Sequence, residues 1–283
     1  MEREYDNLIS QHYQKAAAEH GLSASSTMED HVTRKLETDA IIRIAGALLN
    51  SRKAGVARRR ATILDVGCGN GYTLEMLFKN YPDQQYVGIE KSDELRALAC
   101  RRFAGNDKVR IMQGDARDHD FAKGILADMV VCQRVLINLL NPDDQKLALN
   151  NIIDAALPPR DGWQSGGVLL FIECFASNLA KLNVARSEFD LPPIPPAYHN
   201  LFLPDDFFTA PGLRPLETTD PLPSPNFLST HYFVSRVFFP FASRGKAFKR
   251  NSEFVEFFSA ALKQDVGDYS PLRLHVFERT ESA

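Results

Sequence analysis

A short run of glycines next to an acidic residue is the first feature with the residue types to bind a charged ligand. The run follows the apolar stretch 63–66 and reads Gly67-Cys68-Gly69-Asn70-Gly71. Glycines let the backbone approach a ligand, and a helix that begins there offers free N–H groups. Asp65 lies two residues before the run, where its carboxylate would suit a ligand that carries an ammonium group.

Two further acids follow the next two apolar stretches. Glu90 directly follows the stretch 85–89 and is itself followed by Lys91. An acid at this place can accept hydrogen bonds from both hydroxyls of a ribose. Asp115, followed by Ala116, comes after the stretch 109–112 and can accept a hydrogen bond from the exocyclic amine of adenine. Together the three acids suit one ligand with an amino acid at Asp65, a ribose at Glu90 and an adenine at Asp115.

The elements that must position these residues alternate along the chain from residue 61 onward. Helices are expected at 73–80, after the cap residue Ser92, and after Asn141, which precedes a proline and two acids. Strands are expected at 63–66, 85–89, 109–112, 128–132 and 168–172. Strands that alternate with helices predict a parallel sheet covered by helices on both faces, with ligands bound beyond the carboxyl ends of the strands.

The two ends of the chain carry less regular patterns. Apolar stripes predict two N-terminal helices, within 5–16 and 32–48, joined by the small-residue segment 21–27. After Cys174 the pattern becomes irregular, apart from an amphipathic helix at 251–262 and an alternating strand at 272–277. We therefore expect a helical N-terminal lid over 1–60, a ligand-binding core over 61–174, and, over 175–283, substrate-cover segments that include a C-terminal helical insertion, together with the last two strands.

Composition excludes several function classes. The chain has 283 residues with Lys+Arg 33 and Asp+Glu 36, a balance that argues against a general nucleic-acid binder. No apolar stretch is long enough to span a membrane, and the charged N-terminus does not look like a signal peptide, so we expect a cytoplasmic protein without membrane contact. The cysteines form no C-x-x-C pair, and we expect reduced thiols and no metal.

The stretch 63–71, Glu90 and the run 114–116 resemble the first three motifs of class I S-adenosylmethionine-dependent methyltransferases, and the likeness covers residues 61–174. It implies an α/β fold: a Rossmann-like, seven-stranded, mostly parallel sheet with an antiparallel last strand at 273–278. It also implies S-adenosyl-L-methionine as cofactor and S-adenosyl-L-homocysteine as product. The implied cofactor-binding residues are Asp65, Gly67, Cys68, Gly69, Asn70, Gly71, Glu90, Lys91, Asp115, Ala116 and Gln133.

Other classes fit the same motifs less well. Tyr72 occupies the position where a G-x-G-x-x-G dinucleotide fingerprint needs its third glycine, and Asp65 is not needed by a hydride-transferring enzyme. The stretch 131–135 lacks the Asp/Asn-Pro-Pro-aromatic motif of adenine and amino-cytosine methyltransferases, which argues against methylation of bases. Looser likenesses at 26–30, 134–139, 198–201 and 229–236 resemble bacterial methyltransferases that tailor polysaccharides or natural products.

The expected reaction is transfer of a methyl group to a small polar molecule, above all to a hydroxyl of a sugar or natural-product intermediate. A small amine is the alternative acceptor, with Glu173 or Asp30 holding it, and a catalytically silent cofactor-binding partner is the alternative from another class. His199 is the candidate base, with Glu173 and Arg134 as further catalytic candidates. Candidate substrate-binding residues are Asp30, Tyr198, Asn200, His231, Tyr232 and Arg236. A monomer or a homodimer is expected.

Overall fold

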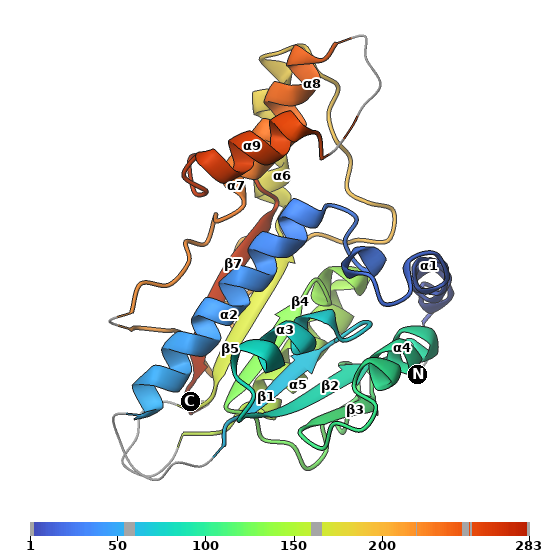
Figure 1. The fold of residues 1–283 in the computed structure, drawn as a ribbon, viewed down its shortest axis with the longest axis vertical. Coiled ribbons are helices and arrows are strands. Elements are labelled where there is room, and N and C mark those ends of the chain that lie inside the picture. Colours follow the sequence, from blue (N-terminus) through green and yellow to red (C-terminus); the bar gives the residue numbers. More distant parts are fainter. Residues whose placement is uncertain are drawn as a thin grey trace.

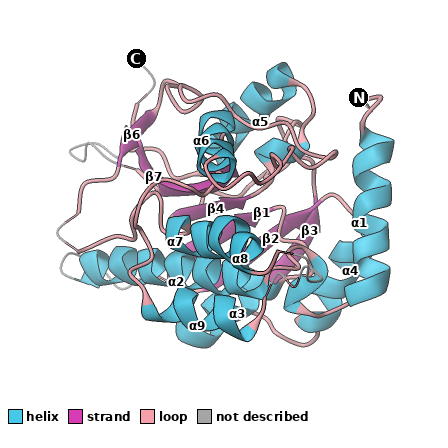
Figure 2. Ribbon diagram, turned by 90° about the horizontal axis from the view of Figure 1, so that it is seen from above, coloured by secondary structure: helices cyan, strands magenta, loops and turns pink. Residues whose placement is uncertain are grey.

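The strands of a computed structural model form one sheet in the order β3-β2-β1-β4-β5-β7-β6 (Figures 1 and 2). The structure describes residues 3–53, 60–159, 166–218, 220–244, 249 and 251–281. Within these residues, parallel pairing joins β1 to β2 and β4, β2 to β3, and β4 to β5, whereas β7 runs antiparallel to β5 and β6. The strands are β1 Thr62–Val66, β2 Gln85–Glu90, β3 Val109–Gln113, β4 Met129–Gln133, β5 Val168–Cys174, β6 Leu213–Pro215 and β7 Leu272–Arg279.

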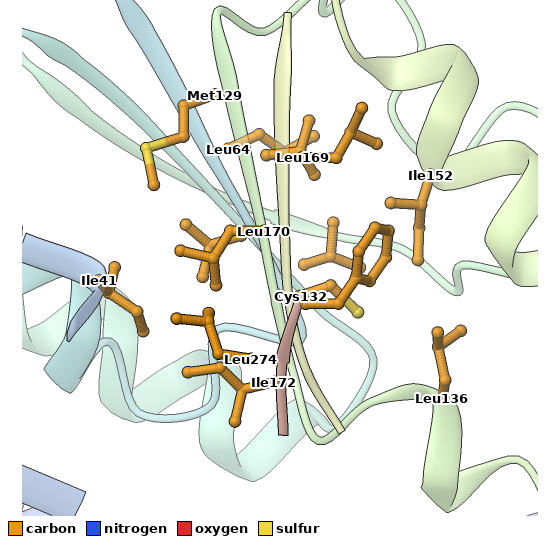
Figure 3. Packing of buried hydrophobic residues seen from close by; sticks show 14 of the residues in the cluster. Ile41, Leu64, Met129, Cys132, Leu136, Ile152, Leu169, Leu170, Ile172 and Leu274 are labelled. Carbon is orange, nitrogen blue, oxygen red and sulfur yellow. The ribbon is translucent and has the colours of Figure 1, made fainter. Parts of the chain in front are cut away.

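Helices cover both faces of this sheet. Ile41 of α2 and Ile152 of α5 lie on opposite sides of the strands, packed against apolar side chains of β4, β5 and β7 (Figure 3). Burial of these side chains on both faces stabilises the sheet and holds the strand ends in register. The helices of this part are α2 His31–Lys53, α3 Tyr72–Asn80, α4 Asp93–Arg102, α5 Pro142–Ala155 and α6 Ala176–Ser187.

Local capping explains where the central helices begin. The side chain of Ser92 accepts a hydrogen bond from the backbone N–H of Leu95 and starts α4. Asn141 accepts from the backbone N–H groups of Asp143 and Asp144, with Pro142 in the first turn of α5. Both helix starts expected from the sequence are confirmed, and so is the sheet with its antiparallel last strand.

The N-terminal segment lies over one end of the sheet. Helix α1 (Asp6–His20) packs against α4, and the 3-10 turn Ala24–Ser26 (η1) leads into α2, which runs alongside the sheet (Figure 1). The small-residue segment 21–27 thus separates the two helices, as expected.

The segment after β5 contains one helix that the sequence predicted and several elements that it did not place. The amphipathic helix expected at 251–262 is confirmed as α9 Glu253–Ala261. The sequence pattern gave no position for α6, for β6 or for the short helices α7 Ser229–Phe233, the π-helix Val234–Phe238 (η3) and α8 Phe239–Ala242. Figure 1 shows α7, α8 and α9 grouped beyond the sheet. Among the described helices, none combines the length and the apolar character that crossing a membrane requires.

Candidate functional site

A cavity of about 360 Å³ lies at the carboxyl ends of the central strands. Strand β1 pairs with β2 on one side and with β4 on the other, so the order of the strands reverses at β1. In open α/β sheets this reversal point is where ligands bind. Residues that follow β1, β2, β3 and β4 line the cavity, together with residues from α1 and α2.

The glycine-rich turn forms the floor of the cavity. Gly67 has a φ of 67°, and a Cβ on it would lie 2.5 Å from Cγ2 of Val135. Only glycine fits this position, because any Cβ would overlap Val135, which lines the cavity together with Gly67. The backbone N–H groups of Gly69 and Ser92 each donate at 2.8 Å to Glu90, one to each carboxylate oxygen. Each oxygen keeps a lone pair, and Glu90 can therefore still accept two hydroxyls.

Asp65 is a buried carboxylate in the cavity wall that has no direct partner in the described part of the chain. Its exposed fraction is 2%, and no described residue donates a hydrogen bond to it or forms an ion pair with it. Burial raises the pKa of Asp65 to about 7, with Arg34 lowering it and Glu90 raising it. A carboxylate held in this way is complementary to a cation that enters the cavity.

Two donors next to Asp65 complete this end of the cavity. Nη1 of Arg34, in α2, donates to Oε1 of Gln133 at 3.0 Å, and the Thr73 hydroxyl donates to the same oxygen at 3.2 Å. Nε of Arg34 and Nε2 of Gln133 are buried without a partner among the described residues. Both residues line the cavity, and their unpaired donors suit an anionic group beside the cation.

Asp115 lies at the far end of the cavity, at the carboxyl end of β3. It accepts hydrogen bonds from Arg117 and pairs with Lys91 at 3.0 Å. Asp6 and Tyr5, from the start of α1, line the cavity next to it. The three acids expected to hold one ligand therefore line one cavity, in the order Asp65, Glu90, Asp115 along the sheet.

Arg134 and Tyr13 line a third part of the cavity. Arg134 has a positive φ of 55° and pairs with the fully buried Glu37 of α2. Asn138 donates at 2.6 Å to the hydroxyl of Tyr13, in α1. Burial raises the pKa of Tyr13 to about 12, so its phenol stays protonated at neutral pH. Tyr13, Arg134 and Asn138 all line the cavity.

Glu173 lies behind this wall and not in it. Its carboxylate is fully buried and accepts hydrogen bonds from the backbone N–H groups of Val135, Leu136 and Ile137 at 2.9–3.3 Å. Burial raises the pKa of Glu173 to about 7, although these hydrogen bonds lower it. The contacts give Glu173 the role of an anchor for the loop that carries Arg134 and Asn138.

His199 also lies outside the residues that line the cavity. Its ring stacks on His12 of α1 with centroids 3.7 Å apart, and its Nδ1 is buried without a partner among the described residues. Burial and the nearby His12 lower the pKa of His199 to about 4. Tyr198 is 68% exposed, and Asn200 donates at 2.8 Å to Asn138. The segment 198–200 thus reaches the cavity wall through Asn138.

Asp30, His231 and Arg236 meet in one buried cluster, which we call the Asp30 cluster. His231 Nε2 lies 3.0 Å and Arg236 Nη2 lies 2.7 Å from the same oxygen of Asp30. Arg236 also lies over the ring of Tyr232, 4.1 Å from its centroid. Asp30 and His231 are fully buried, and neither they nor Tyr232 and Arg236 line the cavity. The cluster joins the start of α2 to α7 and η3.

The expected cofactor residues divide into two groups. Nine of them line the cavity, namely Asp65, Gly67, Cys68, Gly69, Glu90, Lys91, Asp115, Ala116 and Gln133. Asn70 and Gly71 lie behind the turn: the Asn70 amide donates to the carbonyl oxygens of Gly21 and Ser23, and Gly71 precedes α3. Among the described residues, no group of three or more His, Cys, Asp or Glu side chains is arranged to hold a metal ion.

Sequence reasoning missed the residues that the N-terminal helices bring to the cavity, above all Asp6, Tyr13 and Arg34. A pattern that could have revealed Arg34 exists in α2. Arg34 and Glu37 are buried charged residues one turn apart, next to the apolar stripe that packs on the sheet. Charges at such a position indicate an interior polar site.

Residues 63–158 match a family model described as a methyltransferase domain. A stretch of 68 residues is 32% identical to the trans-aconitate 2-methyltransferase of Acidovorax sp. (strain JS42), and it covers 24% of each chain. A stretch of 104 residues is 25% identical to the malonyl-[acyl-carrier protein] O-methyltransferase of Halalkalibacterium halodurans and covers 36% of each chain. The matches therefore span only between 24% and 36% of these relatives' own length.

Solved structures resemble the chain over nearly its whole length. The N-methyltransferase NodS from Bradyrhizobium japonicum WM9, in complex with S-adenosyl-L-homocysteine, has a TM-score of 0.53 and 14% identity over 95% of this chain and 99% of that chain. Magnesium protoporphyrin IX methyltransferase from Synechocystis PCC 6803 has a TM-score of 0.50 and 11% identity over 98% of this chain and 96% of that chain. At these identities the likeness establishes the fold.

Proposed function

We propose that this protein, whose residues 63–158 match a methyltransferase-domain model, transfers the methyl group of S-adenosyl-L-methionine to a hydroxyl of a small polar molecule. A sugar or a natural-product intermediate is the proposed acceptor. The observation that carries the proposal is the unpaired, buried carboxylate of Asp65 beside the unpaired donors of Arg34 and Gln133. This arrangement is complementary to an ammonium group and a carboxylate held side by side, as in an amino acid.

The residues in the rest of the cavity fit the same cofactor. Glu90 keeps two lone pairs for the ribose hydroxyls, and the left-handed Gly67 packs directly against Val135, which also lines the cavity. When bound, S-adenosyl-L-methionine supplies an activated methyl group on a sulfonium. The protein's part is then to align the acceptor and exclude water. Helix α1 provides the cover, because Ile9, Tyr13 and Gln14 line the cavity opposite the sheet.

The geometry favours a hydroxyl over an amine as the acceptor. Glu173 and Asp30 are the carboxylates that would have held an amine. Neither lines the cavity, and both are already satisfied, Glu173 by three backbone N–H groups and Asp30 by His231 and Arg236. The protonated phenol of Tyr13 and the guanidinium of Arg134 line the cavity instead. Hydrogen-bond donors of this kind orient an oxygen-rich acceptor.

A hydroxyl acceptor also needs a base, and we propose His199 for an acceptor that extends beyond the cavity at Asn138, because His199 itself does not line the cavity. Its imidazole is neutral at pH 7 because burial lowers its pKa, and its buried Nδ1 has no partner among the described residues. The neighbouring Asn200 connects it to Asn138 of the cavity wall. Removal of a proton by such a group contributes about 10²- to 10⁴-fold to a rate.

Calorimetric titration with S-adenosyl-L-homocysteine tests the cofactor site, with NAD as the control ligand. Micromolar binding that Asp65→Ala weakens supports the proposal, and binding of NAD in its place contradicts it. A screen of sugars and natural-product intermediates with labelled S-adenosyl-L-methionine then tests the reaction. Cofactor binding with no labelled product from hydroxyl or amine acceptors would support the alternative of a catalytically silent partner protein.

A further inference from the structure

One charged network connects the adenine end of the cavity with the start of α1. Arg117 lies at its centre and is 8% exposed. Its guanidinium donates to Asp115 at 2.6 Å and to Asp6 at 2.9 Å, and it lies 3.5 Å from Asp144, the buried residue in the first turn of α5. Arg3 and Tyr5 also donate hydrogen bonds to Asp144. We call these residues the Arg117 network.

Arg117 does not line the cavity, whereas Asp115 and Asp6 do. The Nε atom of Arg117 lies 3.0 and 3.1 Å from the two oxygens of Asp115, and its backbone N–H donates to the same carboxylate at 3.0 Å. Burial alone would raise the pKa of Asp115, but the hydrogen bonds from Arg117 hold it well below its usual range. The carboxylate is therefore charged and held in one orientation from behind the cavity wall.

Lys91 is the remaining donor to Asp115, and it is the replaceable one. Its ammonium lies 3.0 Å from Asp115 and 2.8 Å from Asp6, and its side chain is 52% exposed. A carboxylate has about four lone-pair sites, and Arg117 with Lys91 fills those of Asp115. An amine entering the cavity can take the place of the exposed Lys91, but not that of the buried Arg117.

We propose that Arg117 is a positioning residue for the base of the cofactor: it orients Asp115 to receive the exocyclic amine of adenine, and it holds α1 closed over that base through Asp6. The proposal rests on the proposed function, because it takes the cofactor to be S-adenosyl-L-methionine. The two contacts of Arg117 have separate consequences. The contact with Asp115 determines which base binds, and the contact with Asp6 determines how long the ligand stays.

The experiment compares S-adenosyl-L-homocysteine with its hypoxanthine analogue, S-inosyl-L-homocysteine, which lacks the exocyclic amine. Affinities are measured by calorimetry and dissociation rates by stopped-flow displacement on the full chain. The wild type should prefer the adenine ligand by about tenfold or more, since a hydrogen bond to a charged group is at stake. Arg117→Gln should reduce this preference to less than about threefold, and Arg117→Lys should restore part of it.

Asp6→Asn separates the second contact from the first. It should keep the preference for adenine while both ligands dissociate about tenfold faster, because the tie to α1 is lost. Asp154→Asn, which breaks the exposed ion pair with Arg279 at 2.9 Å, is the control and should change neither value. The preference is a ratio measured on one protein, so a general loss of stability in a variant does not move it.

The outcomes distinguish this proposal from the proposed function. Equal binding of both ligands by the wild type, or equal weakening of both in Arg117→Gln, would overturn the role at Asp115. Unchanged dissociation in Asp6→Asn would overturn the tie to α1. Failure of the wild type to bind S-adenosyl-L-homocysteine would overturn the proposed function, and this proposal with it.

Discussion

Arg34 of α2 donates a hydrogen bond at 3.0 Å to Gln133, the last residue of β4. This contact brings a residue from the N-terminal segment to the strand end at which the methyltransferase motifs converge. The guanidinium also lies over the ring of Tyr72, 4.9 Å from its centroid. Arg34 is therefore held from two sides beside Asp65, and it is the cation that we expect to bind the carboxylate of the cofactor.

Arg34→Met should weaken the binding of S-adenosyl-L-homocysteine by about 10- to 100-fold, since charge-assisted hydrogen bonds contribute roughly 1.5 to 3 kcal/mol. Binding of 5′-methylthioadenosine, which lacks the amino-acid part, should stay within about twofold. Calorimetry with both ligands measures the difference. Lys35→Met is the matched control, because Lys35 is the next residue and its ion pair with Asp39 is exposed. Equal weakening of both ligands would assign Arg34 a structural role.

The affinity for S-adenosyl-L-homocysteine should depend on the ionisation of Asp65. Burial raises the pKa of Asp65 to about 7, so the carboxylate is charged above that pH and neutral below it. The ligand's ammonium loses its partner as the pH falls, and the dissociation constant should rise by up to about tenfold per unit below pH 7. Titrations from pH 5.5 to 8 measure this slope. Asp65→Asn should bind weakly with no such slope, and a parallel slope in both proteins would refute the assignment.

The same carboxylate should destabilise the protein without ligand at high pH. The pKa of Asp65 is about 7 in the fold against a usual value of 3.8, so ionisation opposes folding increasingly as the pH rises from about 4 to 7. Asp65→Asn should therefore raise the free energy of unfolding by about 1 to 3 kcal/mol at pH 8 and by much less at pH 4. Urea unfolding at both pH values tests this. A variant that is less stable than the wild type at pH 8 would contradict it.

Glu173→Ala should destabilise the protein by about 2 to 4 kcal/mol, because three backbone N–H groups lose their buried acceptor. Glu173→Gln keeps one acceptor oxygen and should cost less. Burial raises the pKa of Glu173 to about 7, so the stability of the wild type should fall as the pH rises through that value. Chemical unfolding of the three proteins between pH 5 and 8 measures both effects. Full stability in Glu173→Ala would show that the loop holds without its anchor.

His199→Ala should lower turnover at pH 7 by about 10²- to 10⁴-fold if His199 removes the acceptor's proton. Binding of S-adenosyl-L-homocysteine should be unchanged, because His199 does not line the cavity. The measurement needs an acceptor found in the screen, with initial rates at saturating cofactor. His12→Ala is the matched variant, since it removes the stacked ring and its hydrogen bond with Tyr198 but leaves His199 in place, and it should retain most of the rate. Near wild-type turnover in His199→Ala would exclude the role as base.

Much of the central sheet could be predicted from the sequence because its strands are short apolar runs that end at glycines or acids. Asp65, Glu90 and Asp115 each follow such a run, and all three line the cavity. The starts of α4 and α5 were also predictable, because the caps Ser92 and Asn141 act through local hydrogen bonds. These features depend on contacts within a few residues.

The remaining parts depend on contacts between distant segments. Helix α6 follows β5 directly, yet its residues showed no clear pattern, and its Arg186 donates to a backbone carbonyl of the π-helix. In the sequence alone, Arg34 resembles any other charged residue of a helix. Its role depends on the contact that α2 makes with the end of β4. Asp30 and His231 are separated by 201 positions, and no local pattern could pair them. Such placements follow from packing and not from local spacing.

The Asp30 cluster has a consequence for exchanging parts of this chain with those of other proteins. It ties the start of α2 to the π-helix through buried charges, and removing one partner of such a pair leaves the other charge unsatisfied. The segment before α2 and the α7–η3 segment therefore depend on each other for stability, although the core separates them in sequence. A chimera that exchanges only one end with a related enzyme should fold poorly.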